Sequence, residues 1–302
     1  MTTAPPPPAG DVSFGAVFSA SWRLFRTNWT IALPPVIAGF AALALLCVYV
    51  VALIAVVGVA GWRAIFAPHA TVPEPVVTSL VATGLLGGAV LWLLTIVLVV
   101  WAESAMYGMA DAAWTRGTAT FGDGFAAFRT RGGAVFVAGI GIFGLAIVAV
   151  ILALPTLFLS IFALPLVTLF VLPAAVGGRR GGFEAIGESF RLLRAFFVPT
   201  LVTWLVLYAI QYGISFLTGF AIVPLELSAM PATPDALPTM PPIPVLGFSG
   251  TMYFASVLLL LAYNGFRATV EVGLFRELEA RRAGTTMLPP ASPPPTIIIP
   301  PA

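Results

Sequence analysis

The amino-acid sequence predicts an all-α, polytopic membrane protein with about six transmembrane helices and short amphipathic helices at its cytoplasmic surface. Of the 302 residues, 60% are hydrophobic and only 9% are charged, whereas soluble globular proteins contain about 25% charged residues. The apolar residues also form runs long enough to cross a bilayer, which takes about 20 residues. The arginines are sorted between alternate loops. Together these observations exclude a large water-soluble core.

The first pair of predicted spans covers residues 31–61 and 76–102. The second run continues past Glu103 into the sequence AMYGMADAAW, which should extend the helix beyond the membrane. Gly84 and Gly88 have the GxxxG spacing that lets another helix approach closely. We therefore expect a long helical hairpin with a contact at these glycines.

The second pair lies within residues 133–176, which contain no charged side chain. This stretch is too long for one span, so we expect two, over 133–154 and 156–176, with a very tight connection at Pro155. Pro165 and Pro173 predict kinks in the fourth span.

The third pair covers residues 195–223 and 245–266. The connection 224–244 is rich in proline and is not expected to be regular helix. Residues 267–282 should continue the sixth helix, because Glu277 and Arg281 have the favourable i,i+4 order, and Gly284 is a suitable stop.

The domain organisation is one membrane domain over residues 11–284, flanked by proline-rich tails at 1–10 and 285–302. Proline favours extended, mobile chain, so the tails are expected to be disordered. Docking of a partner on these proline motifs is the alternative.

Orientation follows from the arginines, which supply every basic side chain. In the six-span model, thirteen of the fourteen fall on one side and only Arg63 falls on the other. Cytoplasmic loops carry the excess of Lys and Arg, so both termini are predicted to be cytoplasmic. The abundance of Ala, Gly, Val and Pro is typical of a GC-rich bacterial genome, which indicates the bacterial inner membrane.

An aromatic, amphipathic segment precedes each pair of spans, at residues 13–28, 121–130 and 183–194. Ser21–Arg26 (SWRLFR) and Ser189–Arg194 (SFRLLR) match at a fixed offset, which favours three repeats of one interfacial helix and one hairpin. Aromatic and arginine side chains together are typical of a helix in the head-group plane; linkers that only cap the spans are the alternative. The candidate lipid contacts are Trp22, Arg23, Arg26, Trp29, Arg179, Arg180, Phe190, Arg191 and Arg194.

These motifs resemble those of a known family. The pattern FGxxF…SWRLFRTNW near the start, the second SFRLLR and the six spans are similar to the membrane domain attached to some bacterial glycerophosphodiester phosphodiesterases, and to stand-alone membrane proteins of that type. The resemblance covers about residues 11–282. No polar region corresponds to the family's hydrolase domain, so it implies no catalytic residue.

The chain offers little material for catalysis. It has one cysteine, Cys47, one histidine, His69, and neither a phosphate loop nor a nucleophile triad. We therefore expect no enzyme activity, no cofactor, no metal and no nucleic-acid partner.

Polar side chains at or inside the spans are the remaining candidates: Glu103, Gln211, Arg267 and Glu271. We expect Arg267 to lie near Glu103 or Glu271, and Gln211 to bond a neighbouring helix. Structural pairing is the first interpretation, and an ion or substrate path is the second.

The function predicted is that of a non-enzymatic membrane protein, such as an envelope scaffold or accessory subunit, that acts through membrane lipids or a protein partner. A transporter or channel for a small apolar or amphiphilic compound is the alternative. A continuous polar path through the bundle would favour transport, and a dry, packed centre would favour the scaffold.

Overall fold

The computed structural model describes residues 14–66, 74–229 and 243–284. These residues form nine α-helices and one 3₁₀ helix, and six helical segments are long and apolar enough to cross a membrane. The multi-pass helical fold expected from the sequence is therefore confirmed. The two proline-rich tails lie outside the described residues.

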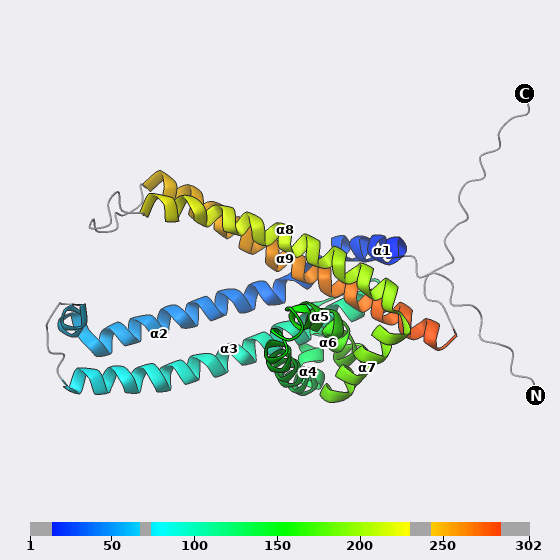
Figure 1. Ribbon diagram of the computed structural model, residues 1–302, viewed down its shortest axis with the longest axis horizontal. Helices are drawn as coiled ribbons and strands as arrows, with labels where there is room; N and C mark the ends of the chain where they lie inside the picture. Colours follow the sequence, from blue (N-terminus) through cyan, green and yellow to red (C-terminus); the bar gives the residue numbers. More distant parts are fainter. Residues whose placement is uncertain (1–13, 67–73, 230–242, 285–302) are drawn as a thin grey trace, which may run out of the picture.

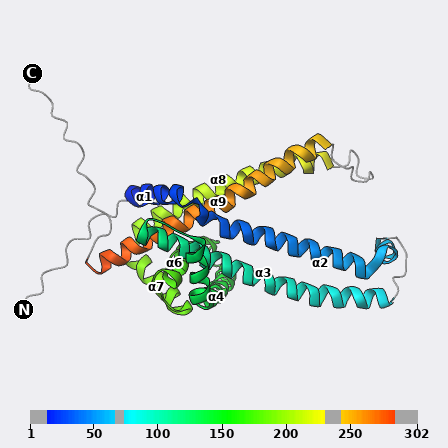
Figure 2. The ribbon, with the colours of Figure 1, turned by 180° about the vertical axis from the view of Figure 1, so that it is seen from behind.

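Two long hairpins dominate the molecule. The first joins α2 (Leu33–Phe66) to α3 (Glu74–Arg116), and the second joins α8 (Phe197–Ala229) to α9 (Ile243–Arg282). Figures 1 and 2 show that the hairpins diverge from one end of the molecule, so that their far ends lie well apart. We call the end where they meet the base.

The base is completed by short helices and by the hairpin that contains the predicted third and fourth spans. α1 (Phe14–Thr27) and η1 (Trp29–Ala32) precede the first hairpin, and α7 (Gly182–Ala195) precedes α8. Between them lie α4 (Phe121–Ile151), α5 (Leu159–Thr168) and α6 (Val171–Val176). Of these helices, α1, η1, α4 and α6 pack against α3 or α9, and α7 packs against α4 and α6.

The last third of α9 is the centre of the base. Most residues of α9 from Tyr263 to Leu278 are buried, whereas most described residues in the membrane-spanning part of α2 are exposed or half-buried. The side chains of Leu274, Phe275 and Leu278 are at most 1% exposed, and they pack in one cluster with Phe170 of the 169–170 turn and Met109 of α3. The hairpins thus have exposed, apolar sides, while the base is packed like a soluble core.

The fourth span is broken between α5 and α6, at residues 169–170. Pro173 is the cause, because it has no N–H for the Leu169 carbonyl and its ring clashes there. Ser189 of α7 stabilises the break: its hydroxyl donates to the Val167 carbonyl at 2.5 Å and accepts from the Phe170 N–H at 3.2 Å. The connection before α5 is a turn over 152–158 that contains Pro155, as expected.

Two boundary predictions were wrong. Residues 121–130 are not a separate interfacial helix but the first turns of α4. The helix begins at a capping box between Thr120 and Asp123 and then meets no proline that would end it. The connection was expected to be irregular from residue 224, but α8 continues to Ala229. The residues LELSA that follow Pro224 are compatible with a helix, and the next proline comes only after them.

Another helix does approach the GxxxG surface, since α2 packs against α3, but the tightest contact is at Gly87. A side chain on Gly84 would meet nothing within 4 Å, whereas a Cβ on Gly87 would lie 2.7 Å from the ring of Tyr49 in α2. The Tyr49 hydroxyl donates to the Gly84 carbonyl at 3.3 Å. An aromatic ring, not a second helix backbone, uses this glycine-rich surface.

Candidate functional site

Buried carboxylates in the base are held by ion pairs and hydrogen bonds. Arg267 Nε lies 2.6 Å from Glu271 Oε1, and the Tyr107 hydroxyl donates to the other oxygen of Glu271. Glu271 is 1% exposed. Glu103 of α3 interacts electrostatically with both Arg267 and Glu271. The predicted proximity of Arg267 and Glu271 is confirmed, and the contact with Tyr107 fastens α9 to α3.

The end of α9 has two further pairs. Arg281 Nε lies 2.8 Å from Glu277 Oε1, as the i,i+4 spacing predicts. Glu188 of α7 is 2% exposed and accepts from Arg282 at 2.6 Å and from Arg191 at 3.0 Å. Both carboxylates are paired with arginine, and the pair of Glu188 with Arg282 links α7 to α9.

The repeated motif places a serine in the same structural role twice. Ser21 in α1 and Ser189 in α7 occupy matched positions and are both fully buried. The Ser21 hydroxyl donates to the Thr269 carbonyl of α9 at 3.5 Å, as Ser189 does to Val167. The repeat therefore encodes the anchoring of α1 and α7 on the base.

An apolar groove of about 700 Å³ lies between α1, α8 and α9. On α1, Phe18, Trp22 and Phe25 meet Phe266 of α9, with ring centroids 5.1 to 5.8 Å apart. On α8, Ile210 and Ile214 form the opposite wall. The two hydroxyls in the lining are both bonded to backbone carbonyls, since Ser19 donates to Ala16 at 3.1 Å and Tyr263 donates to Leu207.

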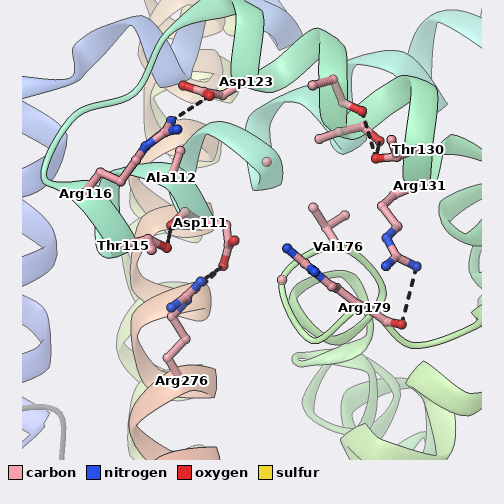
Figure 3. Close-up of a pocket in the computed structure, with 14 residues that line it drawn as sticks. Asp111, Ala112, Thr115, Arg116, Asp123, Thr130, Arg131, Val176, Arg179 and Arg276 are labelled. Atoms are coloured by element: carbon pink, nitrogen blue, oxygen red, sulfur yellow. Dashed lines mark hydrogen bonds and ion pairs between the residues drawn. The ribbon is translucent and has the colours of Figure 1, made fainter.

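A second hollow is polar and has a volume of about 760 Å³. We call it the arginine cup, and Figure 3 shows its lining. It lies between the end of α3, the start of α4, the 177–181 loop and α9. Its charged lining residues are Asp111, Arg116, Asp123, Arg131, Arg179 and Arg276.

Both aspartates of the cup are paired. Arg276 donates to Asp111 Oδ1 from Nε at 2.8 Å and from Nη2 at 2.6 Å, and Arg116 Nη2 lies 2.6 Å from Asp123 Oδ1. Arg131 donates to the Arg179 carbonyl at 3.3 Å. Within the described part of the chain, neither Arg131 nor Arg179 has a carboxylate partner.

Glycines bring the 177–181 loop close to the other walls of the cup. A Cβ on Gly177 would lie 2.6 Å from Asp111 Oδ1, and one on Gly178 would lie 2.8 Å from the ring of Phe275. Arg179 itself has φ +53°, in the left-handed region that non-glycine residues rarely adopt. The sequence GGRRGG is thus a close-packed, strained turn.

The structure separates the predicted lipid contacts into groups. Trp22 lines the groove, while Arg23 and Arg26 are exposed on α1. Trp29 is 59% exposed and Phe190 40%; Arg191 and Arg194 are exposed on α7. Arg179 enters the cup, but Arg180 points to Glu279, 3.8 Å away.

Gln211 does not make the expected contact, since it has no hydrogen bond within the described residues. Its side chain is half-buried in α8, and the hydroxyl of Tyr263 makes the polar link between α8 and α9 instead.

Four charged cup residues were missed by sequence reasoning as site residues: Arg116, Asp123, Arg131 and Arg276. The available signal was the glycine-flanked arginine pair at 179–180, but no local pattern connects that loop with α3, α4 and α9.

Comparison with protein-family models, curated proteins and solved structures gave no match. The resemblance to the membrane domain of glycerophosphodiester phosphodiesterases therefore stays a prediction. The lining of the groove is apolar, and the charged lining of the cup has more arginines than aspartates. No group of three or more metal-ligating side chains occurs among the described residues.

Proposed function

We propose that this protein is a non-enzymatic scaffold or accessory subunit of the bacterial inner membrane that acts through lipids, and that it holds a lipid acyl chain in the groove between α1, α8 and α9. The observation that carries the proposal is the nearly wholly apolar lining of that groove. Its volume of about 700 Å³ is within the usual range of small-molecule sites, roughly 300–1,000 Å³.

The surroundings of the groove support a lipid as its occupant. The α8 and α9 surfaces farther from the base expose large apolar side chains such as Phe216 and Phe254, so the neighbouring medium there is hydrocarbon. On α1, Arg23 and Arg26 are exposed and have no carboxylate partner within the described residues. An anionic head group above the groove complements these charges, at about 1 kcal/mol per arginine near the surface.

The centre of the base supports a scaffold more than a transporter. Side chains of α9 from Tyr263 to Leu278 fill the space between the surrounding helices, and most are fully buried. The buried carboxylates there are held by arginines, which is the arrangement of a packed structural core rather than of a permeation path.

Filling the groove is expected to displace the lipid. Ala262 lines the groove and is half-buried, so Ala262→Phe places a ring in the space while the open side relieves strain. The full-length protein is reconstituted in phosphatidylglycerol vesicles with a phospholipid that has a photoactivatable acyl chain, then solubilised, washed with detergent, and only afterwards irradiated and digested. We expect the retained lipid to form cross-links on Phe18, Ile214 and Leu259, and most of these cross-links to be lost in Ala262→Phe.

The matched control is Ala209→Phe, because Ala209 is exposed on α8 and does not line the groove. It should label like the parent protein. Equal labelling of groove and lipid-facing surface, lost alike on washing, would refute a held acyl chain. Replacement of phosphatidylglycerol by phosphatidylcholine tests the arginines, since retention should fall with the uncharged lipid and fall less in Arg23→Gln/Arg26→Gln.

The proposed orientation predicts a labelling pattern. After Cys47→Ala, single cysteines placed after residues 70 and 235 should react with a membrane-impermeant maleimide from the periplasm. Those after residues 120 and 180 should react only once the membrane is opened, because the arginine-rich side is cytoplasmic. One position on the opposite side would contradict the six-span topology.

A further inference from the structure

The arginine cup combines side chains from four separate parts of the chain. Arg116 ends α3, Arg131 lies in the third turn of α4, Arg179 lies in the loop before α7, and Arg276 lies near the end of α9. The cup contains four guanidinium groups and two carboxylates, those of Asp111 and Asp123, so it has an excess of two positive charges. Such a convergence of like charges is unfavourable unless an anion neutralises it.

The two aspartates identify which arginines are available. Asp111 occupies Arg276 and Asp123 occupies Arg116, at 2.6 Å in both cases. Arg131 and Arg179 are left without a carboxylate in the described structure. In Figure 3 the guanidinium of Arg179 extends into the open centre of the cup, while its carbonyl faces Arg131.

The backbone at Arg179 is held in a costly conformation. A φ of +53° is unfavourable for a residue with a Cβ by about 1–2 kcal/mol. The Arg180 N–H donates to the Ala174 carbonyl at 3.0 Å and fixes the turn after α6. Glycine would relieve this strain, yet an arginine occupies the position. Strain of this kind is typical of residues whose side chain has a binding role.

We propose that the arginine cup binds a phosphate monoester group through Arg131 and Arg179. The planar guanidinium donates two parallel hydrogen bonds to phosphate oxygens, and a phosphate monoester carries about −1.5 to −2 charges at neutral pH, which equals the excess charge of the cup. The ligand is either the head group of a lipid with a terminal phosphate or a free phosphate compound. This site is separate from the acyl-chain groove, which has no lining residue in common with it.

The experiment measures binding to the full-length protein in two arms. One arm titrates inorganic phosphate into protein in phosphatidylcholine nanodiscs. The other compares nanodiscs containing phosphatidic acid, a monoester, with nanodiscs containing phosphatidylglycerol, a diester, by retention of the lipid in native mass spectrometry. Binding in the first arm identifies a soluble ligand, and preference for phosphatidic acid alone identifies a lipid.

The variants are Arg131→Gln and Arg179→Gln, each expected to weaken binding about tenfold or more, because each removes charge-assisted hydrogen bonds. Arg129→Gln and Arg180→Gln are the matched controls, since Arg129 is exposed on α4 outside the cup and Arg180 faces Glu279. Both should bind like the parent protein.

Arg179→Gly separates binding from folding. It removes the strain of the left-handed turn, so its melting temperature should equal or exceed that of the parent, while its affinity for the phosphate group should fall as in Arg179→Gln. Absence of binding in both arms, or equal binding by parent, Arg131→Gln and Arg179→Gly, would overturn the proposal. An equal loss in the control variants would also overturn it, because the effect would then be general surface charge.

Discussion

Replacement of Gly265 by valine is expected to prevent normal assembly of the base. A Cβ at this position would lie 2.8 Å from Ala32 Cα and 2.9 Å from Ala32 N. These are backbone atoms of η1, which cannot rotate away as a side chain does. α9 would have to separate from η1 and from the start of α2, which undoes contacts of Ile31 and Phe266 as well.

Overpacking of a core costs about 1–3 kcal/mol, and more when backbone must move. We therefore expect about 3 kcal/mol or more from Gly265→Val, seen as loss of monodisperse protein after solubilisation and a large fall in melting temperature. Gly213→Val is the control, because a side chain on Gly213 of α8 meets nothing within 4 Å. Similar melting temperatures for the two variants would show that the contact between Gly265 and Ala32 does not limit stability.

Removal of the Glu271 carboxylate is the second change with a large expected effect. Glu271 is 1% exposed and holds both Arg267 and the Tyr107 hydroxyl. Glu271→Ala leaves the Arg267 guanidinium without its ion-pair partner and the Tyr107 hydroxyl without an acceptor. Breaking a buried pair in this way destabilises a protein by about 3–5 kcal/mol.

The measurement is again the melting temperature of purified protein, with two comparisons. Glu279, on the same helix as Glu271, has a 41% exposed carboxylate that lies 3.8 Å from Arg180 of the 177–181 loop. Glu279→Ala removes this surface pair, which contributes at most about 1 kcal/mol. The double variant Arg267→Met/Glu271→Leu removes both charges and should recover part of the loss. If Glu271→Ala melts like Glu279→Ala, the pair does not hold α3 and α9 together.

The outcome for the interfacial segments shows how far sequence patterns reach. The matched SWRLFR and SFRLLR motifs did predict two short helices, α1 and α7, because aromatic spacing and a flanking break are both local signals. The same reasoning was wrong for residues 121–130. An apolar stripe on a helix does not reveal where the helix ends. Between Thr120 and Ile151 the chain contains no proline, so one helix continues through the whole segment.

The sequence by itself determined the features that depend on neighbours along the chain. Six spans follow from the length and hydropathy of the apolar runs, the pair Glu277–Arg281 from helical spacing, and the end of α9 from Gly284, which has φ +78°. Each is fixed by contacts within a few residues, so one segment suffices to predict it.

Only the tertiary structure decided what the base contains. Residues 267–282 were predicted only as a helical extension of the sixth span. They form the buried centre, because the carboxylates of Glu271 and Glu277 meet an arginine or a tyrosine that neighbouring turns and helices provide. The arginine cup likewise joins Arg116, Arg131, Arg179 and Arg276. Their proximity results from the packing of α3, α4 and α9 at glycine contacts far apart in the chain, and hydropathy along a sequence contains no information about which helices meet.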